Sequence, residues 1–251
     1  MGSVVRLLTV IAIGTGALAS ARAVPLFQGA EMPLRSAADL AVGLAQSGHA
    51  AGMVIALPAP LEVALAREQS QPNAFLINRS PFGVWIRNDV SGAKDIPSLS
   101  TDAQAEAAVV DFAARSGLQI AKWRNTPIYL LKSPYAGTCA ARLRAPLASA
   151  VVNRNLVELV ATAIHVATSA KVPGGFVGSC VGVADYAAEP VQLAAGETLE
   201  DALSHAVNTF GNAVWVVVQD GGANCSVGLI RRAQGGGACK TAITSTLEPT
   251  R

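Results

Sequence analysis

Residues 194–230 constrain the fold more than any other stretch, because they predict an amphipathic helix followed by a hairpin. Thr198 suits the N-cap, since its hydroxyl can accept a hydrogen bond from an otherwise unpaired amide of the first turn. Asp201 puts negative charge at the positive end of the helix dipole. Gly211 can end the helix. The apolar residues share one helical face: Leu199, Ala202, Leu203, Ala206, Val207 and Phe210.

Two short apolar runs follow this helix. Residues 214–218 are β-branched except for Trp215, and they predict a buried strand. The Asp220-Gly221-Gly222 turn tolerates positive φ, so the chain can reverse there. Residues 227–230 therefore predict the returning strand.

A weaker copy of the same pattern lies at residues 98–131. Thr101 and Gln104 have the spacing of a capping box, and Ser116-Gly117 can close the helix. Residues 118–123 and 128–131 then predict a second hairpin. Two apolar pairs match at one constant offset: Ala108-Val109 with Ala202-Leu203, and Phe112-Ala113 with Ala206-Val207. The pattern predicts a duplicated module, although alanine-rich helices also imitate one another.

Residues 1–23 predict a cleaved signal peptide. Arg6 is the only charge of the n-region, residues 7–18 form an apolar core, and Ala21-Arg22-Ala23 has the small-x-small form of a cleavage site. The apolar core is shorter than the roughly 20 residues of a membrane span, and a buried N-terminal helix is the alternative. We therefore expect a periplasmic or secreted protein, cleaved after Ala23, without a transmembrane segment in the mature chain.

The composition favours a packed core. Of the 251 residues, 51% are hydrophobic and 14% are charged, which excludes a disordered tail. The net charge of +2 includes Arg6, so the mature chain is close to neutral. It lacks the basic footprint of a nucleic-acid-binding protein, and we expect no nucleic acid partner.

Four cysteines lie in the mature region and are disulfide candidates: Cys139, Cys180, Cys225 and Cys239. Four cysteines permit three pairings in an exported chain. Cys225 and Cys239 bracket the last predicted strand and a glycine loop, so they could staple that loop, leaving Cys139 for Cys180. The absence of a CxxC pair and of a nearby histidine argues against a metal site.

Each half of the mature chain predicts helices and strands in a similar order. In the first half, a helix from Ser36 to about Gly52 precedes strands at 53–57 and 84–87. In the second half, Asn155 can cap a helix over 156–170, and 176–183 predict the next strand. We expect an α+β fold of two similar modules, residues 24–135 and 136–251. Each places about two helices against a short mixed sheet, and the first has an insertion near 58–81.

This order of elements resembles the short N-terminal domain shared by secretins and TonB-dependent receptors. The matching signature is TLEDALSHAVNTFG at residues 198–211, and AEAAVVDFAARSGLQI at 105–120 is its weaker copy. The chain departs from the family because no receptor barrel or secretin multimerisation region follows. The resemblance implies docking or signalling within a larger envelope assembly.

The sequence contains no HExxH, GxSxG or Walker motif. The three histidines are scattered, and His49 has no carboxylate or cysteine at ligand spacing. His165 and His205 lie on the two helices of the second half, and a cavity shared with Asp185 would favour an enzyme. We expect no catalytic, cofactor-binding or metal-binding residue and no cofactor.

The function we expect is non-catalytic docking of a protein partner in the cell envelope, through an exposed sheet edge. Two alternatives stay open. One is a secreted enzyme of unrecognised type, and the other is a disulfide-stabilised structural or inhibitor-like exported protein.

Overall fold

The computed structural model describes residues 33–56, 76–80, 83–87, 99–168, 185–219, 225–234, 238–244 and 247. The helices within them are α1 (Pro33–Gln46), α3 (Asp102–Ser116), α4 (Gly137–Leu143), α5 (Leu156–Thr168) and α6 (Leu199–Phe210). The strands are β1 (Ala51–Ala56), β2 (Leu76–Ser80), β3 (Gly83–Arg87), β4 (Gln119–Lys122), β5 (Tyr129–Lys132), β6 (Val151–Asn155), β7 (Tyr186–Leu193), β8 (Ala213–Gln219), β9 (Cys225–Arg232) and β10 (Ala238–Thr244).

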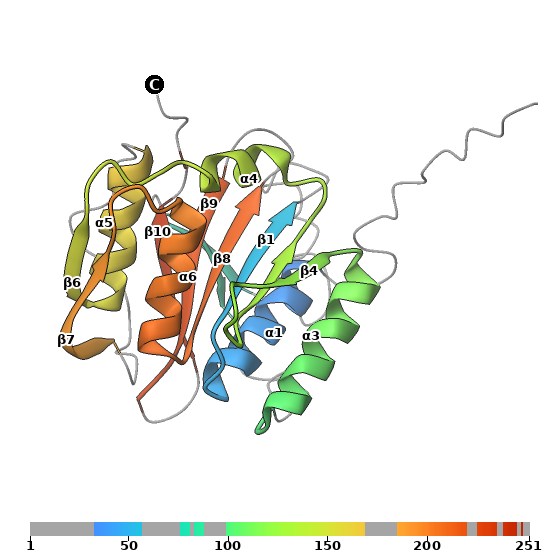
Figure 1. The fold of residues 1–251 in the computed structure, drawn as a ribbon. Coiled ribbons are helices and arrows are strands. Elements are labelled where there is room, and N and C mark those ends of the chain that lie inside the picture. The colour runs from blue at the N-terminus through green and yellow to red at the C-terminus, as the bar shows by residue number, and fades with distance from the viewer. Residues whose placement is uncertain are drawn as a thin grey trace, which may run out of the picture.

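One six-stranded sheet organises the molecule, in the order β10-β9-β8-β1-β5-β4 (Figure 1). β1 lies in the middle and runs parallel to both of its neighbours, β8 and β5. The outer pairs are antiparallel, so the sheet is mixed. Every residue of β1 is buried, as expected for a short apolar strand that is covered on both faces.

Helices cover both faces of this sheet and bury two hydrophobic clusters. α1 and α3 pack on one face, where they meet Met53 and Ile55 of β1. α4, α5 and α6 pack on the other face, where they meet Val54 of β1. The alternation along β1 follows from the two-residue period of a strand. The ribbon of β6 and β7 packs against α5 and α6, and the β2–β3 hairpin lies against β9 and β10.

The helix ends confirm the local signals of the sequence. Thr101 caps α3 in a complete capping box with Gln104, and Gly117 ends that helix with a φ of 64°. Thr198 caps α6 by accepting from the amide of Asp201, and Gly211 follows Phe210 as the C-cap. Each cap satisfies backbone groups that have no partner inside the helix.

The predicted class, α+β, is confirmed, and both predicted hairpins exist as β4–β5 and β8–β9. The two hairpins join the shared sheet differently. In the first hairpin the second strand, β5, pairs with β1, whereas in the second hairpin the first strand, β8, pairs with β1. The division into modules 24–135 and 136–251 stays a prediction, since both halves contribute strands to one sheet. The predicted signal peptide, the strand at 176–183, the turn at 220–222 and most of the insertion lie outside the described residues.

Candidate functional site

β4 forms one edge of the main sheet, and β5 is its only strand neighbour among the described residues (Figure 1). All four of its residues are exposed. The opposite edge strand, β10, lies against β3 instead. The β6–β7 ribbon also has outer edges, but Pro190 interrupts β7 and removes a donor there. β4 is therefore the candidate site for pairing with another chain.

The hydrogen-bond pattern fixes which backbone groups of β4 point outward. The amide of Trp123 donates to the carbonyl of Ile128 at 2.9 Å, so this opposed pair belongs to the hydrogen-bonded class of the hairpin. Bonded and non-bonded pairs alternate along an antiparallel ladder, which places Ala121 and Gln119 in the bonded class as well. The amides and carbonyls of Ile120 and Lys122 consequently face the open edge.

The face of β4 that meets α3 carries two exposed apolar side chains and an ion pair. Ile120 is 41% exposed, and Val110 of α3 is 49% exposed. Lys122 Nζ lies 3.9 Å from Glu106 Oε1, and both side chains are about half exposed. Such a solvated pair contributes little to stability. Lys122 also lies over the ring of Tyr129, 5.2 Å from its centroid.

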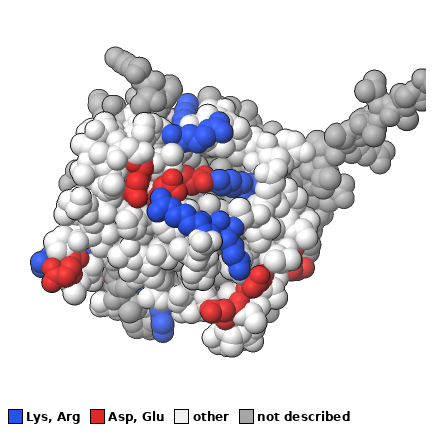
Figure 2. Space-filling model, viewed as in Figure 1, with Lys and Arg blue, Asp and Glu red and all other residues white. Residues whose placement is uncertain are grey.

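The face of β4 that meets α6 is held by polar contacts. Trp123 donates from Nε1 to Asp201 Oδ1 at 2.8 Å, and Lys132 of β5 donates to Glu200 at 2.7 Å. Arg124, at the tip of the hairpin, lies 3.7 Å from Asp201 and 3.9 Å from Glu197. Figure 2 shows cations and carboxylates side by side on this face. These contacts fasten the edge hairpin to the first turn of α6, where the helix dipole favours carboxylates.

His205 of α6 completes this cluster. Its Nδ1 lies 3.4 Å from Glu197 Oε1, and its ring stacks on Trp123 with centroids 6.3 Å apart. The guanidinium of Arg124 also lies over the Trp123 ring, 4.7 Å from its centroid. The arrangement packs the hairpin tip by stacking and charge.

The pKa of Tyr129, which lies opposite Lys122 in the hairpin, is raised above its ordinary value. Burial raises the pKa of its phenol, and hydrogen bonding to Glu106 and the charge of that carboxylate raise it further. Lys122 opposes them by lowering the pKa. Tyr129 therefore couples α3 to the edge hairpin.

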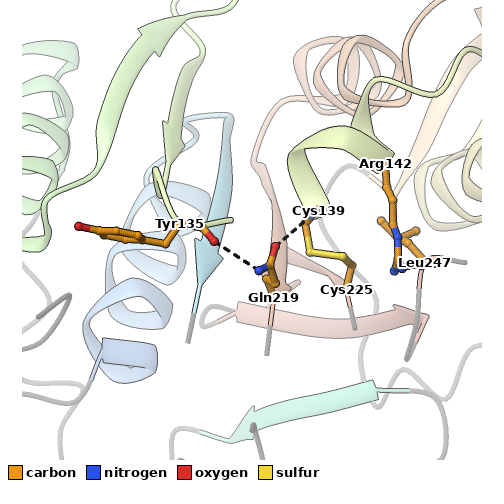
Figure 3. The surroundings of a disulfide bond; sticks show 6 residues. All are labelled: Tyr135, Cys139, Arg142, Gln219, Cys225 and Leu247. Carbon is orange, nitrogen blue, oxygen red and sulfur yellow. Dashed lines mark hydrogen bonds between the residues drawn. A yellow bond between two sulfur atoms is a disulfide. The ribbon is translucent and has the colours of Figure 1, made fainter. Parts of the chain in front are cut away.

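The cysteines pair differently from the expected staple. Cys139 of α4 bonds Cys225 at the start of β9, with their Cα atoms 5.6 Å apart (Figure 3). Cys239 of β10 lies opposite Arg231 of β9 in the ladder between these strands. Arg231 is six residues beyond Cys225, so Cys239 is roughly 20 Å from Cys225 along the strand. Expecting a Cys225–Cys239 bond, and hence Cys139–Cys180, was wrong for this reason. Cys239 is also disulfide-bonded, and Cys180 lies outside the described residues.

Side-chain contacts reinforce this disulfide. Gln219, the last residue of β8, accepts from the amide of Cys139 at 3.1 Å and donates to the carbonyl of Tyr135 at 3.3 Å (Figure 3). Arg142 donates to the carbonyl of Leu247. α4 is thereby fixed across the ends of β8 and β9. A disulfide suits an oxidising compartment such as the periplasm or the cell exterior.

The polar residues considered for catalysis have separate partners. Asp185 forms a buried ion pair with Arg231 of β9, whereas His205 contacts Glu197 and Trp123. His165 lies on the exposed side of α5. His49 bonds the carbonyl of Leu99 at 2.8 Å and lies 3.6 Å from Asp102, partners that its sequence neighbourhood did not reveal. Within the described part of the chain, Asp185 and His205 therefore have different contact partners.

Comparison of the chain with protein-family models, with curated proteins and with solved structures finds no match. Among the described residues, no helix is long and apolar enough to cross a membrane.

Proposed function

We propose that this protein is a non-catalytic docking module of the cell envelope, and that it binds an extended segment of a protein partner by adding it as a strand beside β4. The observation that carries the proposal is the outer edge of β4, which no other described strand covers, with the backbone groups of Ile120 and Lys122 directed outward. Strand addition of this kind uses main-chain hydrogen bonds for affinity and side chains for specificity.

The energetics of the edge fit a reversible interaction. Two outward-facing residues offer two amides and two carbonyls, and each bond to a partner contributes about 0.5–1.5 kcal/mol net. Bonds of that number stabilise a complex only when side-chain contacts add to them. The hairpin is fastened to α6 through Trp123 and Arg124, so the edge is already ordered before a partner arrives. An ordered edge lowers the entropic cost of docking.

Kinship with the short N-terminal domain of secretins and TonB-dependent receptors is part of the same proposal. The resemblance implies a helix, a strand pair, a second helix and a final hairpin. The succession of α5, β7, α6 and the β8–β9 hairpin supports it in part, because β7 is the one described strand between α5 and α6. The Cys139–Cys225 bond supports an exported location, including the periplasm that this kinship implies.

A photo-crosslinking residue at Lys122 tests the docking function in cells that produce the protein. We expect a discrete adduct with one envelope protein when the crosslinker replaces Lys122. The same crosslinker at Val152, an exposed residue of β6, is the matched control and should give no such adduct.

A proline at Ile120 tests whether the backbone carries the interaction. The Ile120 amide points away from β5, so Ile120→Pro removes an outward donor while leaving the hairpin bonds of Ala121 and Trp123 in place. We expect the adduct at Lys122 to be lost while the melting temperature changes little. Identical adducts from Lys122 and Val152, or an adduct that survives Ile120→Pro, would contradict docking through β4.

A further inference from the structure

The two faces beside the open edge differ in chemistry. On the α3 side, Ile120 and Val110 are exposed apolar side chains. On the α6 side, β4 presents Gln119 and Ala121, and Trp123 is buried beneath its contacts with α6. A strand added to this edge therefore meets Val110, Ile120 and Lys122 on one face, and Gln119 and Ala121 on the other.

The ion pair between Glu106 and Lys122 aligns α3 with β4 and places the two apolar residues together. Val110 lies one turn beyond Glu106 on the same side of α3, about 6 Å along the axis. Ile120 lies two residues before Lys122 on the same face of β4, about 7 Å along the strand. The helix and the strand run in opposite directions because Gly117 and Leu118 join them directly. Val110 and Ile120 consequently lie side by side.

Lys122 adds a positive charge beside the apolar side chains of Val110 and Ile120. Its side chain is 54% exposed, and its distance of 3.9 Å from Glu106 is longer than a charge-assisted hydrogen bond. An incoming carboxylate opposite Lys122 can therefore pair with the ammonium without displacing a strong bond. Lys122 also disfavours an added strand that places a cation opposite it. The edge therefore selects strands with an acidic residue at that position over strands with a basic one.

We propose, building on the docking function above, that the segment received by β4 is an amphipathic strand of another protein. It carries β-branched apolar residues toward α3, against Val110 and Ile120, and an acidic residue opposite Lys122. Its other face lies toward Gln119 and Ala121 and carries a polar residue beside Gln119. The alternation follows from the two-residue period of the added strand.

A synthetic heptapeptide provides the probe. Acetyl-Thr-Glu-Thr-Val-Thr-Val-Thr-amide places glutamate opposite Lys122 and valine opposite Ile120 in an antiparallel pair, and the reversed sequence does so in a parallel pair. Titration into the 15N-labelled mature chain should shift the amide signals of Ile120 and Lys122 most. Replacing both valines by threonine should weaken binding by about tenfold, since two buried apolar groups are lost. Replacing glutamate by lysine should weaken it by about threefold, less at high salt.

Variants of the protein give the matched comparison. Ile120→Thr should weaken binding of the valine peptide by about threefold to tenfold. Val152→Thr changes an exposed valine of β6 and should leave binding unchanged.

The outcomes separate the two proposals. Equal binding of the valine, threonine and lysine peptides, with shifts still centred on Ile120 and Lys122, would leave docking intact and overturn the proposed chemistry of the segment. No binding of any peptide, together with cellular adducts that survive Ile120→Pro, would overturn docking itself. A concentration-dependent dimer that protects the Ile120 and Lys122 amides without peptide would make a second copy the occupant and also overturn this inference.

Discussion

Gly52 lies opposite Trp215 in the ladder between β1 and β8, where the backbone of one strand approaches the side chain of the other. A Cβ at this position would stand 2.1 Å from the indole Cζ2. Trp215 is fully buried, and its Nε1 donates to Ser204 of α6 at 3.3 Å. The indole therefore has little room to move, and glycine is required by space rather than by backbone conformation.

We expect Gly52→Ala to lower the free energy of unfolding by about 3 kcal/mol, because overpacking a buried site forces side chains and backbone to shift. Urea unfolding followed by tryptophan fluorescence measures the change. Gly137→Ala is the matched control, since a Cβ there meets nothing within 4 Å. Equal stabilities of the Gly52→Ala and Gly137→Ala proteins would show that the contact with Trp215 is not tight.

Tyr129 makes a second prediction at the scale of one residue. Its pKa is raised in the folded state, so the fold retains the phenol proton more strongly than the unfolded chain does. The resulting stability is complete below the ordinary tyrosine pKa of about 10 and is lost as pH rises through the folded value.

Two measurements check the behaviour of Tyr129. Spectrophotometric titration near 295 nm should show a late-titrating tyrosine, and Tyr129→Phe should remove it. Unfolding between pH 9 and 11 should show a smaller alkaline loss of stability in Tyr129→Phe than in the parent protein. A late-titrating phenol that persists in Tyr129→Phe would assign the shift to another tyrosine.

At the scale of elements, the disulfide between Cys139 and Cys225 joins α4 to β9 across 86 residues of sequence. Closing a loop of this length restricts the unfolded chain, and removing such a bond costs about 2–5 kcal/mol. We expect Cys139→Ala combined with Cys225→Ala to unfold at lower urea concentration than the parent. Peptide mapping without reductant should recover the Cys139–Cys225 pair, and recovery of a Cys225–Cys239 peptide would contradict the structure.

Elements with strong local signals were predictable from the sequence. The caps at Thr101 and Thr198 and the glycines that end those helices mark α3 and α6, because capping depends on residues close in the chain. The hairpins β4–β5 and β8–β9 followed from apolar runs on either side of turn residues.

Other elements carried no such signal. α4 is short and its N-cap, Ala136, offers no side-chain bond. β7 contains Pro190 and is mostly exposed, and β10 is interrupted by polar residues, so neither has the apolar period of a buried strand. Without a signal for β10, the sequence does not show that Cys239 lies opposite Arg231, far from Cys225 along β9. The candidate site depends on which strand ends the sheet, and strand order arises from long-range pairing that local patterns do not specify.

At the scale of the whole molecule, the halves depend on one another through β1. This strand belongs to residues 24–135 but pairs with β8 over its full length, and β8 belongs to residues 136–251. Separating the halves would leave the backbone of β1 unpaired along one edge in the first half. It would leave the facing edge of β8 unpaired in the second half. We expect neither half to show dispersed amide signals or cooperative unfolding alone, and we expect mixing them to restore both. A half that unfolds cooperatively by itself would support two independent modules.

The position of β1 also affects the order in which the chain can fold as it is synthesised. Its two neighbours lie far downstream, with Ala51 beside Tyr129 and Val214. Folding is slow when the pairing strands are distant in sequence, and the unpaired strand is exposed during that interval. The apolar segment AGMVIA therefore has no β8 to pair with until the last third of the polypeptide is made, and we expect it to be prone to aggregation until then.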